Sequence, residues 1–189
     1  LVDGAHAPGM LPLDIVAINV RYEILYTEFV RKALQQTGTG GPNVGGCTSF
    51  ALLPPQTENG HLLMGENWDW IPNIEGIVVH ARREGQPESL AFTEAGIAGA
   101  KIGLNGAGIG LAINGLVTDQ DTWSRLLKPF HVRTWEVLGS RTLDEAVDAV
   151  VGTKRACSAN FLIGKADGGT AEVVDVETSP EAECRFTPS

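Results

Sequence analysis

A run of helix- and strand-breaking residues, Thr37 to Gly46 (TGTGGPNVGG), divides this chain of 189 residues into two parts with different patterns. Before the run, apolar residues recur at helical spacing from Leu13 to Gln36, which predicts one long helix. After it, from Thr48 to Gly115, short apolar runs bounded by turn residues predict mainly strands. A chain of this length suits a single domain, so we expect the helix to pack against the strands.

The first two strands are predicted to form a hairpin. The runs Thr48 to Leu53 and His61 to Asn67 flank Asn59-Gly60, and Asn-Gly is the strongest short-range signal for a hairpin turn. Further strands are predicted over 77–82, 90–93, 109–115, 161–164 and 170–177, and further helices over 130–138 and 143–151. This order of elements predicts an α+β fold in which two packed β-layers carry helices on their outer faces.

Composition excludes several classes of protein. The net charge of −9, without a basic stripe, argues against nucleic-acid binding. No apolar run approaches the roughly 18 residues of a membrane span, so no membrane partner is expected. The three cysteines show no CxxC spacing, which fits a reducing compartment, and we expect a cytoplasmic protein. The four histidines are scattered without metal-ligand spacing, so we expect neither a metal nor another cofactor.

Cys47 stands between the breaker run and the first strand. A thiol becomes nucleophilic when a base takes its proton, and the sequence suggests no Cys–His pairing. If the Gly46–Cys47 peptide bond were cut, Cys47 would carry a free α-amino group, whose pKa of about 7.7–8.0 suits it to accept that proton. Cys47 would then be both nucleophile and base. The alternative is a buried structural thiol, the interpretation that we give to Cys157 and Cys184.

A second polar cluster, Glu66-Asn67-Trp68-Asp69-Trp70, closes the return strand of the hairpin. Asp69 and Asn67 are candidate site residues, although both could simply satisfy backbone groups in a turn. Trp68 and Trp70 are expected on one face of the chain, where they would either flank a substrate pocket or join the core.

Ser49 and Asn114 are candidates because of their strand positions. Ser49 lies two residues after Cys47 and therefore on the same strand face. Asn114 interrupts an apolar run, where a buried amide needs hydrogen-bond partners. For both, an ordinary structural role is the alternative. The glycine-rich segment 103–108 lacks the spacing of a phosphate-binding loop, so we assign it no nucleotide.

Several segments, taken in order, resemble the acyl-coenzyme A:6-aminopenicillanate acyltransferase (isopenicillin N acyltransferase-like) family of N-terminal nucleophile cysteine hydrolases. The segments that carry the resemblance are Asn19–Glu23, Gly46–Ser49, Gly65–Trp70, Thr93–Gly108 and Ser158–Gly164. The resemblance implies a four-layer αββα sandwich made as a precursor that cuts itself between Gly46 and Cys47. It also implies that residues 1–46 form a propeptide or short chain bound to residues 47–189, the N-terminal portion of a catalytic domain.

The same resemblance implies roles for single residues. Cys47 would attack a linear amide and form a thioester, and Asp69 would help to position the new α-amino group. Ser49 and Asn114 match family positions near the scissile bond and in the active site. The implied substrates are small-molecule N-acyl amides or acyl thioesters. We favour a general amidohydrolase, with 6-aminopenicillanate-type acyl transfer and β-alanyl-amine hydrolysis as alternatives.

The sequence departs from the family pattern in two ways. Glu66 stands where related bile-salt hydrolases have an arginine, which argues against bile salts as substrates. The sequence also stops short of a Thr-Asn segment that supplies an oxyanion-hole donor in the family, so the C-terminal part of the domain is expected to be missing. A catalytically inactive binding domain on the same fold is therefore the alternative from another class. Arg21 and Glu23 are expected to be exposed or paired charges on the first helix.

Overall fold

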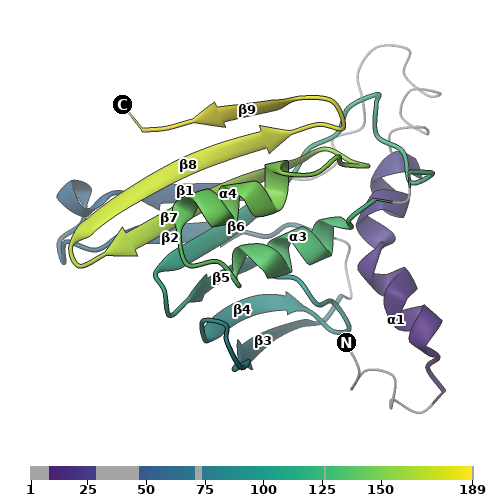
Figure 1. Cartoon of the computed structure of the whole chain (residues 1–189), viewed down its shortest axis with the longest axis horizontal. Coiled ribbons are helices and arrows are strands. Elements are labelled where there is room, and N and C mark those ends of the chain that lie inside the picture. Colours follow the sequence, from purple (N-terminus) through teal and green to yellow (C-terminus); the bar gives the residue numbers. More distant parts are fainter. Residues whose placement is uncertain (1–8, 29–46, 71–73, 126, 189) are drawn as a thin grey trace.

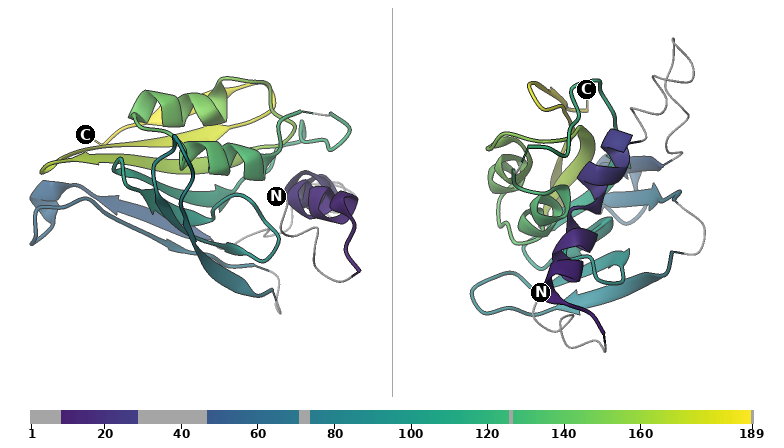
Figure 2. Two further views of the ribbon diagram at one scale, coloured as in Figure 1. Left: turned by 60° about the horizontal axis from the view of Figure 1, so that its bottom comes forward. Right: turned by 90° about the vertical axis from the view of Figure 1, so that its right-hand side faces the viewer.

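The computed structural model describes residues 9–28, 47–70, 74–125 and 127–188. Within them, two antiparallel sheets lie one against the other, and helices cover the outer face of the larger sheet (Figure 1). Figure 2 shows these layers edge-on, with the N-terminal helical segments packed across one end of the sheets. The predicted α+β architecture is confirmed.

The larger sheet has seven strands that neighbour one another in chain order. They are β3 Gly76–Ala81, β4 Ser89–Glu94, β5 Ile102–Asn105, β6 Ile109–Gly115, β7 Ala159–Asp167, β8 Thr170–Thr178 and β9 Glu183–Phe186. The smaller sheet consists of β1 Thr48–Leu52 and β2 Leu63–Asn67, joined through a short 3₁₀ turn, Pro54–Gln56. The helices are α1 Pro12–Asn19, α3 Phe130–Val137 and α4 Leu143–Val151, and residues 21–28 are also helical.

The β1–β2 hairpin confirms the prediction made from Asn59-Gly60. Its register runs from Thr48 opposite Asn67 to Leu52 opposite Leu63. One face of the hairpin packs on the larger sheet through Ala51 and Met64. Because Thr48 pairs with Asn67, the next positions outward, 47 and 68, lie side by side at the end of the hairpin.

The helices α3 and α4 form where the sequence predicts them. Thr142 caps α4: its hydroxyl accepts a hydrogen bond from the Glu145 amide, and the Glu145 carboxylate in turn accepts one from the Thr142 amide. The apolar sides of both helices bury a continuous core against β6, β7 and β8. Its largest fully buried members include Ile109, Leu111, Val137, Val150, Phe161, Ile163 and Val176.

The prediction of a single long helix over Leu13 to Gln36 is wrong in one respect, because the helix is interrupted at Val20. Next to the break, the Asn19 side chain leaves the helix surface: its amide donates to the Gly96 carbonyl, and its carbonyl accepts from the Ala98 amide. These bonds tie the chain to the β4–β5 loop at the point where the helix changes. The remainder of that predicted helix, and the breaker run, lie outside the described residues.

Two strands were not predicted. β5 has only four residues and begins within a glycine-rich stretch, and a Cβ at Gly103 would lie 2.8 Å from a Leu138 side-chain carbon. β9 is exposed at every position and lies at the sheet edge, so it carries no alternating apolar pattern. After β5 the chain turns through Gly108, whose φ of +83° favours glycine.

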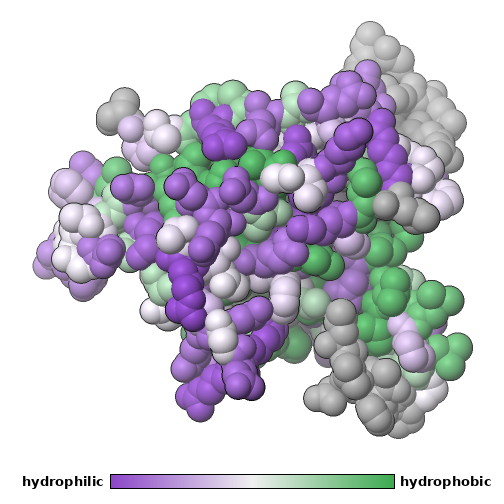
Figure 3. All heavy atoms as spheres, viewed as in Figure 1, coloured by the Kyte–Doolittle hydropathy of each residue, from purple (hydrophilic) through white to green (hydrophobic). Residues whose placement is uncertain are grey.

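The described part of the chain contains no helix long and apolar enough to cross a membrane. Apolar side chains are nevertheless exposed along α1, where Leu13 and Val16 face outward, and Figure 3 shows this helix as part of an apolar area on the molecular surface.

Candidate active site

The β1–β2 hairpin brings Cys47 and Asp69 together. Cys47 directly precedes β1 and Asp69 lies two residues after β2, so the register that pairs Thr48 with Asn67 places them across from each other. The Cys47 Sγ lies 3.5 Å from the Asp69 backbone carbonyl, to which the thiol donates. The Asp69 side chain itself is exposed. The structure thus links the two predicted residues through the Asp69 backbone.

Cys47 borders a small cavity of about 20 Å³, room for about one water molecule. Side chains from the N-terminal helical segment, the β1–β2 hairpin, the β4–β5 loop, β6 and α3 meet there. The lining residues are Arg21, Tyr22, Tyr26, Cys47, Trp68, Trp70, Lys101, Ile113, Gly115 and His131. The walls are therefore aromatic and apolar apart from the thiol, two cationic side chains and one imidazole.

The surroundings of Cys47 favour the thiol over the thiolate. Burial raises the pKa of the Cys47 thiol, and the negative charges of Glu66 and Asp69 raise it further, while backbone hydrogen bonds at Asp69 and Gly115 offset part of this effect. Because the thiolate is the nucleophile, Cys47 needs a nearby group that takes its proton or supplies a positive charge.

Ser49 and Asn114 touch each other. The Ser49 hydroxyl donates to the Asn114 Oδ1 at 2.6 Å, which links β1 of the small sheet to β6 of the large one. The contact satisfies the partly buried amide within the apolar run, as the sequence requires. Asn67, at the end of β2, is exposed and does not line the cavity. The cavity brings Cys47 together with both predicted tryptophans but not with Asn67.

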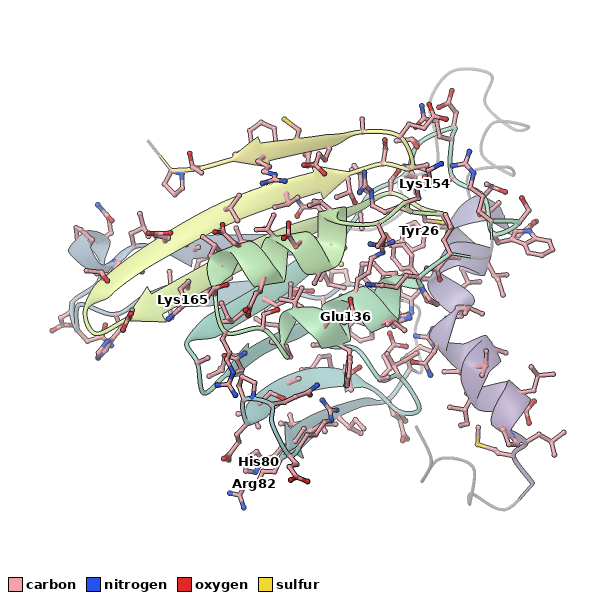
Figure 4. The ribbon with its side chains drawn as sticks, viewed as in Figure 1. Tyr26, His80, Arg82, Glu136, Lys154 and Lys165 are labelled. Carbon is pink, nitrogen blue, oxygen red and sulfur yellow. The ribbon has the colours of Figure 1, made fainter. Side chains whose placement is uncertain are left out.

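Trp68 and Trp70 contact different aromatic partners. Trp68 meets Phe92 edge-on with ring centroids 5.6 Å apart, and Trp70 lies parallel to Tyr26 at 6.1 Å. Tyr26, labelled in Figure 4, comes from the helical segment that precedes the cysteine. Both tryptophans are partly buried, so they close the cavity beside Cys47 and at the same time belong to the packing between elements.

Glu66 lies under the hairpin and points toward β6. Its Oε2 accepts a hydrogen bond from the Ile113 amide at 3.0 Å, and its Oε1 is buried without a hydrogen-bond partner among the described residues. Burial raises the pKa of Glu66 to about 7, while the Ile113 hydrogen bond and the charge of Lys101 act in the opposite direction. Its environment therefore favours the protonated carboxyl more than water does.

A buried ionic cluster lies beside the cavity, formed by Arg21, Glu94, Lys101 and His131. Glu94, which is 1% exposed, pairs with Arg21 through one oxygen and with the Lys101 Nζ, at 3.1 Å, through the other. The Lys101 Nζ also lies 3.0 Å from the His131 Nε2. Burial lowers the pKa of Lys101 to about 7, and the positive charge of Arg21 lowers it as well. Buried charges of this kind are stable only when they are paired.

The hydrogen bonds around His131 define its protonation state. Its Nδ1 lies 3.0 Å from the Asn19 backbone carbonyl, which can only accept, so Nδ1 carries the proton. Its Nε2 then accepts from Lys101. Burial lowers the pKa of His131 well below the usual range, and the charge of Lys101 adds to this effect. His131 is thus a neutral acceptor that holds Lys101 in place.

The helical segment over residues 21–28 is attached to the rest of the site through buried contacts. The Tyr22 hydroxyl donates to the Ser158 carbonyl at 2.8 Å, and its ring stacks on Phe130 at 4.0 Å. The Glu23 carboxylate accepts from the Phe130 amide at 2.6 Å, where it satisfies the first turn of α3. Arg21 is therefore a paired charge, as expected from the sequence. Glu23 is instead buried, with one oxygen bonded to the Phe130 amide and the other without a hydrogen-bond partner among the described residues.

Sequence reasoning missed Lys101, Glu94 and His131 as members of the site. Glu94 ends β4 and Lys101 directly precedes β5, so the two lie at opposite ends of one loop. His131 lies 30 residues beyond Lys101, on α3. No local sequence spacing connects these three residues, so they could not be recognised together. His131 lines the cavity beside Cys47 although the sequence suggests no Cys–His pairing. Among the residues that the structure describes, no group of three or more His, Cys, Asp or Glu side chains is arranged to hold a metal ion.

Comparisons with known proteins agree with the fold. No protein-family model and no curated protein sequence matches the chain. Among solved structures, the Caenorhabditis elegans orthologue of N-acylethanolamine-hydrolyzing acid amidase superposes with a TM-score of 0.50 at 15% sequence identity. The match covers 76% of this chain and 64% of that chain, so the present sequence spans less than two thirds of the length of this neighbour. At this identity the likeness establishes the fold, whose two antiparallel sheets and helices correspond to the N-terminal nucleophile hydrolase architecture. The resemblance to the acyltransferase family stays a prediction.

Proposed function

We propose that the protein is a cysteine amidohydrolase of the N-terminal nucleophile type, which cleaves linear, non-peptide amide bonds through a thioester on Cys47. The observation that carries this proposal is the position of Cys47, at the start of β1 and on the wall of a cavity that buried ionisable groups surround. The fold likeness to an amidase supports the same class of chemistry.

The proposed reaction proceeds in two steps. The Cys47 thiolate attacks the amide carbonyl carbon, the C–N bond breaks, and the amine leaves with a proton from the α-ammonium group of Cys47. Water then attacks the thioester, which releases a carboxylic acid and restores the thiol. An amine that replaced water in the second step would make the same enzyme an acyltransferase.

We propose that the α-amino group arises by cleavage between Gly46 and Cys47, and that the resulting short chain stays bound. The contacts of Asn19, Arg21, Tyr22 and Glu23 with the β4–β5 loop, β4 and α3 support its retention.

Replacing Cys47 by alanine is expected to lower the hydrolysis rate of N-acyl amides on the order of 10³-fold or more, because the attacking atom is lost. The measurement is the release of free amine from a panel of short- and long-chain N-acyl amides. Cys184→Ala is the matched control, since that thiol is exposed and far along the chain. Hydrolysis that survives in the Cys47→Ala protein would contradict the proposal, and hydrolysis by neither protein would favour the inactive binding domain.

A further inference from the structure

The uncut chain raises a chemical problem at Cys47. Before the Gly46–Cys47 bond breaks, the Cys47 nitrogen is an amide and cannot accept a proton. The thiol that is to open this bond therefore needs a different proton acceptor. The surroundings of the Cys47 thiol do not promote its ionisation, since burial and the negative charges of Glu66 and Asp69 raise its pKa. The need for such an acceptor rests on the proposed function, in which the thiol of the precursor opens its own peptide bond.

Lys101 borders the same small cavity as Cys47. Lys101 is 5% exposed and comes from the turn between β4 and β5. A thiolate at Cys47 would favour the ammonium form of Lys101. The cavity, of about 20 Å³, has room for one water molecule that could relay a proton between them.

The surroundings of Lys101 suit a neutral amine. An amine has two N–H groups and one lone pair, whereas an ammonium has three N–H groups and none. A Glu94 oxygen and the His131 Nε2 lie 3.1 and 3.0 Å from the Nζ, and both acceptors are fixed, Glu94 by Arg21 and His131 by the Asn19 carbonyl. The Nζ is hydrogen-bonded to the His131 Nε2, whereas the Glu94 Oε1 lies at ion-pair distance without making a hydrogen bond. With one hydrogen-bond partner among the described residues, a neutral amine leaves fewer N–H groups unpaired than an ammonium does.

Charges from every element around Lys101 act on its protonation. Burial and Arg21, from the helical segment, both lower its pKa, while Glu66 from β2 and a Cys47 thiolate raise it, with a net value of about 7. Glu94 from β4 is shared with Arg21, which reduces the stabilisation that this carboxylate can give to a Lys101 ammonium. His131 from α3 is neutral and supplies an acceptor without charge.

We propose that Lys101 takes the proton of the Cys47 thiol in the uncut chain, and that Arg21, from the segment before the cleavage point, keeps Lys101 ready to do so by occupying Glu94. The S–H bond breaks and an N–H bond forms on the Nζ, directly or through one water. The thiolate adds to the Gly46 carbonyl carbon, the C–N bond breaks, and the Cys47 nitrogen receives the proton back from the Lys101 ammonium. Water hydrolyses the resulting thioester to a Gly46 carboxylate and a free thiol.

The test is the pH dependence of Cys47 alkylation by iodoacetamide, read by mass spectrometry on the species in which Cys47 is still joined to Gly46. In the wild type the rate is expected to rise with a midpoint near pH 7, the pKa of Lys101. Lys101→Met should remove this rise and slow alkylation at pH 7 about tenfold or more, because the thiolate fraction falls tenfold for each unit of pKa. Cys184, an exposed thiol in the same chain, is the internal control and should keep its own profile in both proteins.

Arg21→Met is the second variant and keeps the experiment decisive if Lys101→Met does not fold. Loss of the Arg21 charge raises the pKa of Lys101, so the Cys47 midpoint should move to higher pH. An unchanged midpoint in folded Lys101→Met, or in Arg21→Met, overturns the inference. The alkylation profile needs no turnover: a midpoint that depends on Lys101 in a protein that hydrolyses no amide would leave this inference standing and reject the proposed function.

Discussion

Replacing Glu94 by glutamine is expected to lower the free energy of unfolding by about 3–5 kcal/mol, the range seen when one partner of a buried ion pair is removed. Glu94 is 1% exposed and is the carboxylate shared by Arg21 and Lys101. Its neutral replacement would leave the buried Lys101 and the partly buried Arg21 without this negative partner. Denaturant unfolding of the full chain measures the change.

The matched control is Glu88→Gln, which removes an exposed carboxylate that pairs with His80 and Arg82. Solvent screens such a pair, so this variant should unfold almost as the wild type does. The loss in Glu94→Gln should also be smaller at pH 9 than at pH 6, because Lys101, with a pKa of about 7, sheds its charge in between. Equal losses for the two variants would contradict the buried ionic cluster.

Replacing Phe130 by alanine is expected to cost about 3–5 kcal/mol of stability, as is typical of a buried aromatic residue. Phe130 is 4% exposed, and its ring stacks on Tyr22 of the N-terminal segment and on Phe161 of β7. The substitution therefore removes core volume and also part of the surface that holds the segment before Cys47. Thermal and denaturant unfolding measure the loss.

Phe186→Ala is the comparison for this second variant, since Phe186 is 50% exposed on the edge strand β9. A surface substitution of this kind should stay within about 0.5 kcal/mol of the wild type. If cleavage at Gly46–Cys47 occurs, the Phe130→Ala protein should also release its short chain more readily on size-exclusion chromatography. A Phe130→Ala protein as stable as Phe186→Ala would mean that residues 21–28 do not pack as described.

The parts of the fold that were predictable from the sequence are those with local signals. Asn59-Gly60 fixes the β1–β2 hairpin, and the Thr142–Glu145 capping box fixes the start of α4. β5 and β9 lacked such signals, being four residues long and either glycine-containing or fully exposed. The helix break beside Asn19 depends on hydrogen bonds to a loop 77 and 79 residues away, which no local pattern reveals.

The residues of the candidate site likewise fall into those that the sequence could predict and those that it could not. Cys47 and Asp69 could be paired from the sequence because a single hairpin joins them. Ser49, expected on the strand face of Cys47, instead contacts Asn114 and does not line the cavity. Lys101 and His131 could not be predicted, since their place in the cavity depends on how the β4–β5 loop and α3 pack against the segment before the cysteine. The buried cations and carboxylates acquire their shifted pKa values only from that packing.

The most direct test of Cys47 as an N-terminal nucleophile is the intact mass of the purified protein under denaturing, reducing conditions, beside Cys47→Ala. We expect two fragments in the wild type, separated between Gly46 and Cys47, and one uncut chain in the variant. The new Cys47 terminus would then carry the α-amino group that the proposed reaction requires. A single uncut chain in both proteins would contradict the assignment of Cys47 as an N-terminal nucleophile.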